Sequence, residues 1–325
     1  MTGRPASWRD GSGDDTNDAL IEYATLTYER TGRIARITFS RPDQGNSITP
    51  DTPLDLAAAV ERADLDPRVR VILVSGRGKG FCGGYDLAAS AEGLMDGDMV
   101  GSRDASGTVL DPLVQMANHD PAGTWDPMVD YAMMSRFTRG FASLLHANKP
   151  TVAKIHGFCV AGGTDIALHC DQIVIASDAK IGYPPTRVWG VPSAGLWAHR
   201  LGDQRAKRLL LTGDCLSGQE AYEWGLAIEA AAPDDLDART ENLLERIAAM
   251  PLNQLMMVKL ALNSALLSQG VENSRMISTV FDGISRHSRE GYAFQQRAAE
   301  VGFRQAVRER DGAPYDDAGH STNKG

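Results

Sequence analysis

The sequence predicts an α/β fold, and three observations carry that prediction. Residues 69–75 form a nearly continuous run of β-formers, as in a strand of a parallel sheet that is covered on both faces. Residues 151–156 and 172–175 have the same character. Patterns with helical period fall between these runs, at 53–65 and 137–147 among others. Strands that alternate with helices in this order indicate α/β architecture.

The two ends of the chain fall outside this pattern. Residues 1–22 are rich in Gly, Ser, Asp and Asn and poor in apolar residues, so we expect a disordered N-terminal segment. We also expect residues 311–325 to form a flexible tail. Residues 23–29 and 34–39 alternate apolar with polar side chains around a Thr-Gly turn signal, which predicts a hairpin with one exposed face.

Two further regions differ from the alternating part. Residues 88–131 contain much Gly, Asp, Met and Pro without a sustained period, which indicates a long functional loop or a lid. Beyond Pro192 the patterns become almost entirely helical, and a late helical block is typical of a packing or oligomerisation region. We therefore expect a core over 23–215 that contains an inserted loop at 88–131, followed by a helical region over 216–310.

Composition and charge exclude several classes of protein. The 42 acidic residues outnumber the 33 basic ones, and a net charge of -9 disfavours nucleic-acid binding, which needs clustered Lys and Arg. The four cysteines form no CxxC pair, so neither a disulfide framework nor a structural zinc site is indicated, in keeping with a reducing cytoplasm. No run approaches the roughly 18 apolar residues of a membrane span, and the start lacks a secretory core. We expect a cytoplasmic protein with neither a nucleic-acid nor a membrane partner.

A glycine-rich turn follows the first buried strand and reads GFCGGYDL over residues 80–87. Glycines let the main chain approach a ligand and leave N–H groups free to point at an anion, although an ordinary strand-to-helix turn is the alternative. Two nucleotide-binding patterns fail on spacing. The lysine of a P-loop precedes Ser or Thr, whereas Lys79 precedes Gly80, and the third glycine of a dinucleotide fingerprint would fall on Phe81.

A second glycine segment reads HGFCVAGGTDIALHCD over residues 156–171 and also follows a strand. The chain from Gly163 onward is compatible with a helix. The N–H of Gly162 would then lie at the positive end of that helix, where a developing oxyanion is stabilised. Asp165 falls in the first turn, and its side chain can reach the same space. The alternative for Asp165 is an acid that only complements the helix dipole.

Taken together, these two segments and their surroundings resemble the crotonase family, the enoyl-CoA hydratases and isomerases. The resemblance runs from about residue 25 to 308 and is strongest at 41–48, 80–87, 149–171 and 211–213. It implies a crotonase-like α/β fold, with a ββα spiral core and a C-terminal helical trimerisation region, in a homotrimer or homohexamer. It also implies an acyl-CoA thioester substrate, with no cofactor other than the coenzyme A that the substrate carries.

In that family two backbone N–H groups hold the thioester carbonyl, and the matching residues here are Tyr85 and Gly162. Chemistry at the α or β carbon of a thioester builds negative charge on its oxygen, which such donors stabilise. Ala161 replaces the first glycine of the family's Gly-Gly-Gly run, a change expected to matter little because the next residue is the donor. We expect the substrate to contact Gln44, Gly84, Tyr85, Asp86, Leu87, Gly162, Phe294 and Arg297.

The two glutamates with which family hydratases hold water are both altered. The first matches Asp165, and the second matches Pro185, which cannot act as acid or base. Hydration of a 2-enoyl-CoA to a 3-hydroxyacyl-CoA is our first interpretation, with Asp165 as the catalytic acid/base. Double-bond isomerisation by that single carboxylate is the alternative, and a catalytically weak acyl-CoA binding protein is another. A further acid/base group could come from Asp111, His119, Asp120, Asp126, Asp130, Tyr183 or His199.

A metal centre is the remaining alternative for the second glycine segment. The segment holds five side chains of types that bind metals: His156, Cys159, Asp165, His169 and Cys170. His156 and Cys159 would span the end of a strand and a turn, away from the helix face that carries His169. We therefore expect no metal.

Overall fold

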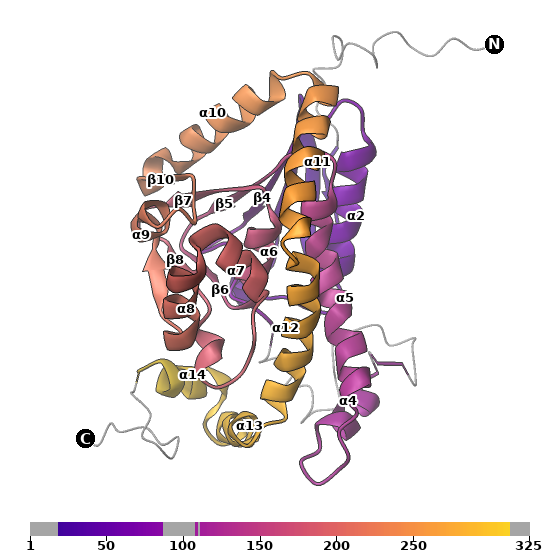
Figure 1. Ribbon diagram of the computed structural model, residues 1–325, viewed down its shortest axis with the longest axis vertical. Helices are drawn as coiled ribbons and strands as arrows, with labels where there is room; N and C mark the ends of the chain where they lie inside the picture. The colour runs from indigo at the N-terminus through magenta and orange to yellow at the C-terminus, as the bar shows by residue number, and fades with distance from the viewer. Residues whose placement is uncertain (1–18, 87–107, 110, 313–325) are drawn as a thin grey trace, which may run out of the picture.

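The computed structural model describes residues 19–86, 108–109 and 111–312, and Figure 1 shows strands beside a large set of helices. A seven-stranded sheet has the order β1-β2-β3-β4-β5-β7-β10, and a three-stranded sheet has the order β6-β8-β9. The strands of the large sheet are β1 Ile21–Glu22, β2 Leu26–Thr31, β3 Ile34–Phe39, β4 Val71–Gly76, β5 Thr151–Ile155, β7 Gln172–Ala176 and β10 Glu229–Ala231. Those of the small sheet are β6 Phe158–Val160, β8 Lys180–Gly182 and β9 Cys215–Ser217.

Strand pairing in the large sheet agrees with the predicted α/β architecture. β2 and β3 form the predicted antiparallel hairpin, whereas β3, β4, β5, β7 and β10 pair in parallel. The central strand β4 is buried along almost its whole length, as its run of β-formers predicts. The expected exposed face of the hairpin is exposed only in part, because on that face Thr31 is exposed and Glu29 half-buried, whereas Thr27 is buried.

The predicted helices are present, and α5 is longer than its sequence pattern indicates. It begins at Pro127, where the Asp126 side chain accepts hydrogen bonds from the N–H groups of Met128 and Val129. It packs against α2, α6 and α12. None of the described helices has the length and apolar content needed to cross a bilayer. The α-helices are α2 Thr52–Leu65, α4 Pro112–His119, α5 Pro127–His146, α6 Gly162–His169, α7 Ala194–Leu201, α8 Asp203–Thr212, α9 Gly218–Glu223, α10 Leu236–Ala248, α11 Leu252–Ser268, α12 Val271–Arg286, α13 Arg289–Val301 and α14 Phe303–Gly312.

Several predicted boundaries need correction. The segment 88–131, expected to be an irregular loop, contains α4 and the start of α5; residues 88–107 and 110 lie outside the described part of the chain. α4 is capped by the Asp111 side chain, which accepts from the N–H of Leu113, and eight residues are too few to show a helical period.

The helical region expected over 216–310 also contains strand residues. β9 crosses the expected boundary at 215, and β10 joins the large sheet beside β7. Both strands have three residues, which is too short for a β pattern to be recognised. At the two ends, β1 starts before residue 23 and α14 extends to Gly312, so the structured part is slightly longer than predicted.

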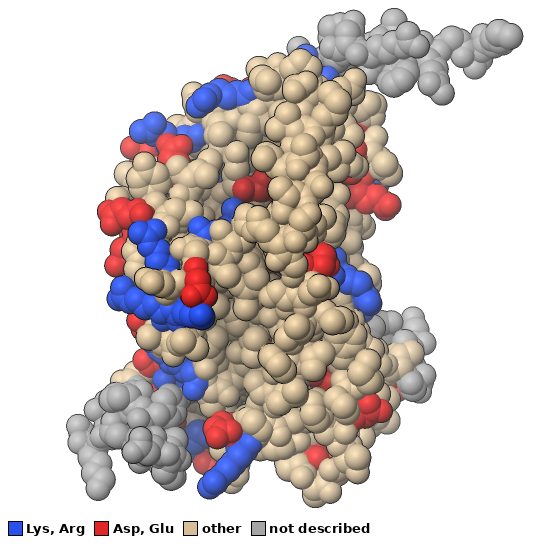
Figure 2. All heavy atoms as spheres, viewed as in Figure 1, with Lys and Arg blue, Asp and Glu red and all other residues tan. Residues whose placement is uncertain are grey.

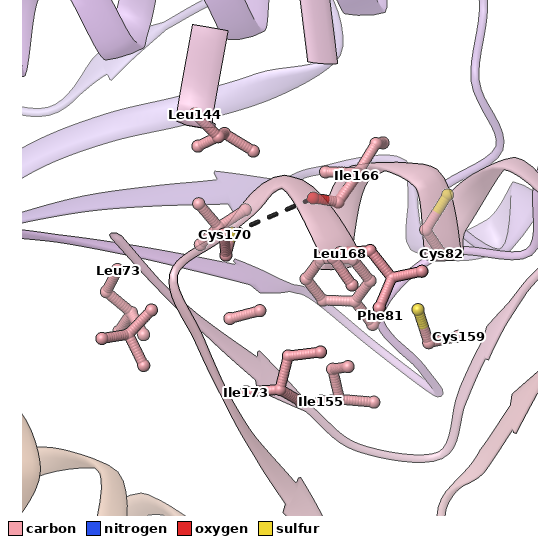
Figure 3. Packing of buried hydrophobic residues seen from close by; sticks show 14 of the residues in the cluster. Leu73, Phe81, Cys82, Leu144, Ile155, Cys159, Ile166, Leu168, Cys170 and Ile173 are labelled. Carbon is pink, nitrogen blue, oxygen red and sulfur yellow. Dashed lines mark hydrogen bonds between the residues drawn. The ribbon is translucent and has the colours of Figure 1, made fainter. Parts of the chain in front are cut away.

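One apolar core lies beneath both glycine segments. Figure 3 shows Phe81, Cys82 and Cys159 beside Ile166 and Leu168 of α6. All five residues are fully buried. A parallel bridge joins Cys82 to Cys159, so the first glycine segment is fixed directly to the strand that leads into the second. The core therefore sets the position of one segment relative to the other.

Candidate active site

The backbone around Tyr85 is oriented by a bridge to Ile48. The N–H of Ile48 donates to the carbonyl of Gly84 at 2.8 Å, and the N–H of Asp86 donates to the carbonyl of Ile48 at 2.9 Å. In a parallel bridge of this type one residue bonds the two neighbours of its partner. The N–H of Tyr85 itself therefore points to the other side of the strand.

The two glycine segments come into contact at Gly84 and Gly162. A Cβ atom added to Gly84 would lie 2.6 Å from the Cβ of Ala161 and 3.4 Å from the nitrogen of Gly162. A Cβ atom added to Gly162 would lie 2.7 Å from Cε2 of Tyr85. The structure thus brings the predicted donors Tyr85 and Gly162 together, and it requires glycine on both sides of the contact.

The N–H of Gly162 lies at the start of α6, as predicted. Helix α6 begins at this residue, so its N–H has no partner within the helix. Within the described part of the chain, the N–H groups of Tyr85 and Gly162 donate no hydrogen bond. Two neighbouring N–H groups, one of them at the positive end of a helix, are suited to stabilise an anionic oxygen.

Ala161, which precedes the second donor, has an unusual backbone conformation. Its φ is 53° and its ψ is -133°, a region that L-residues other than glycine rarely occupy. Such a conformation costs on the order of 1–3 kcal/mol and persists only where the surroundings enforce it. Ala161 therefore carries backbone strain that follows from replacing the family's first glycine, an effect that the sequence comparison did not predict.

Asp165 lies one turn into α6, and only 4% of the residue is exposed. Burial disfavours the charged form and raises the pKa of the Asp165 carboxyl from 3.8 to about 7, although the N–H of Ser193 donates to Oδ1 at 2.9 Å. A carboxyl with this pKa can exchange a proton near neutral pH, as acid/base catalysis requires. The prediction that Asp165 reaches the space beside the donors is consistent with this geometry.

A small cavity lies beside three of the predicted residues, Tyr85, Asp165 and Tyr183, and Gly162 is not among the residues that line it. It has a volume of about 10 Å³, and Tyr85, Asp165, Tyr183 and Ser193 line it. A polar cavity of this size accommodates about one water molecule. Burial raises the pKa of both tyrosine hydroxyls well above 10, which makes them hydrogen-bond donors rather than bases at neutral pH.

Asp282 also lines this cavity, and the sequence analysis missed it. It comes from α12, and its Oδ1 accepts a hydrogen bond from the N–H of Val191 at 3.1 Å. Its Oδ2 pairs with the guanidinium of Arg286, and Arg286 Nη2 also lies 2.6 Å from both oxygens of Asp130. No motif marks Asp282, because only the packing of α12 brings it to the site.

The remaining predicted contacts of the first glycine segment are structural or untested. The carboxylate of Asp86 bonds the Arg41 guanidinium at 2.8 Å and the Ser47 hydroxyl at 2.9 Å, which anchors the turn. Gln44 is exposed at the end of a short 3-10 helix and does not line the cavity. Leu87 lies outside the described residues.

Phe294 and Arg297 of α13 do not line the cavity either. The Phe294 ring is buried in a second apolar cluster, where it packs edge-on against Trp189 and Phe303. Arg297 is exposed and pairs with Glu300 and Glu309. Their predicted contact with the coenzyme A part of the substrate stays a prediction.

The other candidates for a second acid/base group lie in structural roles, with Tyr183 as the exception. Asp111 and Asp126 cap helices, and Asp120 accepts from the N–H of Ala122. His119 stacks on His287, and burial lowers its pKa to about 4. His199 bonds Gln269, Asp130 pairs with Arg286, and Pro185 lies in the 3-10 helix Pro184–Arg187.

A larger cavity lies elsewhere in the molecule. It measures about 340 Å³ and is lined by residues around β9 and α8, among them Arg187, Arg208 and Cys215. It shares no lining residue with the smaller cavity. Size alone therefore does not identify the site, because the smaller cavity is the one that Asp165 and Tyr85 line. In the described ranges no three His, Cys, Asp or Glu side chains come together as a metal site requires.

A largely parallel sheet whose glycine-rich connections carry two free backbone N–H groups and a buried carboxyl is typical of an α/β enzyme. The sequence profile of the enoyl-CoA hydratase/isomerase family matches residues 29–108 and 126–299. The chain belongs to this family. The gap in the match, at 109–125, contains α4, so α4 is an addition to the family's common core.

Individual proteins of known name or structure that are similar to this chain support its membership of the family. The crystal structure of an enoyl-CoA hydratase from Mycobacterium smegmatis has 64% identity and a TM-score of 0.83, and the match covers 93% of this chain and 98% of that one. A probable enoyl-CoA hydratase of Rhizobium meliloti is 28% identical over 84% of this chain and 95% of its own. An (E)-benzylidenesuccinyl-CoA hydratase of Thauera aromatica is 28% identical over 84% and 97%. The fold is therefore the crotonase fold, as predicted.

Proposed function

We propose that this enzyme adds water to a 2-enoyl-CoA thioester and forms a 3-hydroxyacyl-CoA. One arrangement carries the proposal. The N–H groups of Tyr85 and Gly162 are free to donate, and the segments that contain them are in contact. Tyr85 also lines the same cavity as Asp165. The names of the relatives, most of them hydratases that act on CoA thioesters, support the same reaction.

In the proposed mechanism the thioester oxygen accepts hydrogen bonds from both N–H groups. Attack at the β carbon moves charge onto that oxygen as an enolate, and donors that are already in place stabilise it without reorganisation. Asp165 then gives its proton to the α carbon, for which a pKa of about 7 is well matched. The coenzyme A of the substrate is the sole organic group that this chemistry needs.

A panel of 2-enoyl-CoA and 3-enoyl-CoA thioesters tests the proposal, with Asp165→Asn as the matched variant. Asparagine keeps an oxygen that can accept from the N–H of Ser193 but holds no exchangeable acid proton. We expect hydration of 2-enoyl thioesters, with kcat reduced on the order of 100-fold or more in the variant. Turnover of 3-enoyl thioesters alone would assign the enzyme to isomerisation, and tight binding without turnover would make it a binding protein.

We also propose that the enzyme assembles as a homotrimer or homohexamer through α11 and α12. Figure 2 shows few charged side chains over these helices. A contiguous apolar surface of this kind marks a protein interface. Light scattering should give a mass of three or six times the chain mass of 35.0 kDa. The exposed apolar residues are Met257, Val258, Leu260 and Leu262 on α11 and Met276, Ile277, Phe281 and Ile284 on α12.

We further propose a cytoplasmic location. Each of the four cysteines, all of them within described residues, is a free thiol, and three of the four are buried. Free thiols are typical of proteins that work in a reducing compartment.

A further inference from the structure

We propose that Asp282 is the second acid/base group of this enzyme, the base that deprotonates the attacking water. The assignment rests on the proposed hydration. It goes beyond that proposal by naming a residue for the role of the second glutamate of family hydratases, which corresponds to Pro185 here. Proline has no group that accepts a proton. A hydratase that uses two acid/base groups and carries this substitution takes the second group from another part of the chain.

Asp282 and Asp165 bind the same short segment. The N–H of Val191 donates to Oδ1 of Asp282 at 3.1 Å, and the N–H of Ser193 donates to Oδ1 of Asp165 at 2.9 Å. Residues two apart on a chain of trans peptides have Cα atoms at most about 7.6 Å apart. Both carboxylates line the same cavity, which is large enough for about one water molecule. The two groups are thus arranged around one reacting centre.

The surroundings of the two carboxylates differ. Asp165 is buried with no cation among its hydrogen-bond partners, and its carboxyl is partly protonated near neutral pH. Asp282 pairs with the guanidinium of Arg286, and 13% of its side chain is exposed. Each carboxylate oxygen accepts more than one hydrogen bond, so Asp282 retains acceptor capacity for a water molecule. Two carboxyl groups in unequal environments are typical of an acid and base pair.

The proposed step balances. The Asp282 carboxylate takes a proton from water, and the water oxygen forms a bond to the β carbon of the enoyl thioester. The π electrons move to the thioester oxygen, which becomes an enolate oxygen bound by the N–H groups of Tyr85 and Gly162. The α carbon then takes a proton from Asp165 as the carbonyl re-forms. Asp282 has gained one proton and Asp165 has lost one, and exchange with solvent restores both.

The first experiment compares Asp282→Asn with Asp130→Asn. Both changes remove one carboxylate from Arg286, but Asp130 does not line the cavity. We expect Asp282→Asn to reduce kcat for a short-chain 2-enoyl-CoA on the order of 100-fold or more, with little change in KM. Asp130→Asn should change kcat by less than about fivefold, because it leaves the base in place. Equal losses in the two variants would overturn the assignment, since they would place the effect in the Arg286 ion pairs.

A second readout separates this assignment from the proposed function. Exchange of the α hydrogens of a saturated acyl-CoA with deuterated water needs the two N–H groups and Asp165, but not Asp282. We expect Asp282→Asn to retain exchange while it loses hydration. Hydration by Asp282→Asn at the wild-type rate would remove Asp282 from the mechanism and leave the proposed function intact. Absence of hydration in the wild-type enzyme would remove the proposed function, and this assignment with it.

A structure of the wild-type enzyme with a 3-hydroxyacyl-CoA product tests the assignment without a variant. The product hydroxyl carries the oxygen that came from water, so it should lie about 3 Å or less from a carboxylate oxygen of Asp282. A hydroxyl that bonds a different acid/base group would overturn the assignment even if Asp282→Asn fails to fold.

Discussion

The two halves of the candidate site are built in different ways. The oxyanion half consists of the backbone N–H groups of Tyr85 and Gly162, and the direction of each N–H follows from a strand bridge or a helix start. The acid/base half consists of side chains from α6 and from α12, which is distant in sequence. Figure 1 shows α12 beside α7, and these two helices are in contact.

This contrast explains which half departs from the family pattern. A backbone donor does not depend on the side chain of its own residue, so Ala161 can stand beside it at the cost of strain. A side-chain acid or base is lost with a single substitution, as at Pro185, and another element then has to supply it. The four predictions that follow test this division, from the largest expected effect to the smallest.

Tyr85→Pro tests whether the N–H of Tyr85 is the donor. Proline removes the N–H and, because Ile48 bonds Gly84 and Asp86 instead, it removes no bond of the bridge. We expect kcat to fall on the order of 100- to 1000-fold relative to Tyr85→Ala, which removes the same ring and keeps the N–H. Steady-state kinetics of the two variants, with circular dichroism to check folding, measure the difference. Equal rates would show that this half of the site does not act through the backbone.

Asp165→Asn should stabilise the folded protein at neutral and alkaline pH. The folded pKa of about 7 exceeds the unfolded value of 3.8, so the unfolded chain loses its proton first as the pH rises. Stability then decreases between about pH 4 and pH 7 and stays low above that range. Asparagine avoids this loss, which is on the order of 2–4 kcal/mol. Urea unfolding at pH 4 and pH 8 should give a small difference at pH 4 and the full difference at pH 8.

The hydration rate should depend on pH through Asp165. As the proton donor, Asp165 must be protonated in the free enzyme, so kcat/KM should decrease about tenfold per pH unit above its pKa of about 7. Asp165→Asn should lose this limb of the profile. A value of kcat/KM that instead rises through pH 7 would show that Asp165 acts as a base, as double-bond isomerisation requires. It would contradict the role of Asp165 as the proton donor in hydration.

The fold could be predicted from the sequence wherever an element was long. The run at β4 and the patterns of α2 and α5 are long enough to be recognised, and all three elements are present. The three-residue strands β9 and β10 and the eight-residue α4 are too short for that signal. The two strands form because neighbouring strands supply hydrogen-bond partners, as β7 does for β10, and this information lies in the tertiary structure.

The sequence predicted the backbone half of the site and Asp165, but not Asp282. Glycine runs mark Gly84 and Gly162, since a Cβ atom at either position would overlap the other segment, and such constraints are visible in the sequence. Asp282 carries no such mark. It is one of two acids on an amphipathic helix, and it reaches the cavity only because the helix packs against the segment that contains Val191.

The smallest predicted effect concerns the strain at Ala161. Its φ of 53° favours glycine, so Ala161→Gly should relieve a backbone cost on the order of 1–3 kcal/mol in the folded protein. Glycine is also more flexible in the unfolded chain, and this offsets part of the gain in stability. We expect a net stabilisation of about 1 kcal/mol in urea unfolding. Ala58→Gly is the matched control, because Ala58 is exposed within α2, where the same change should destabilise by about 1 kcal/mol. If both variants lose stability, the backbone half of the site is not strained, and the difference between the halves lies in the acid/base residues alone.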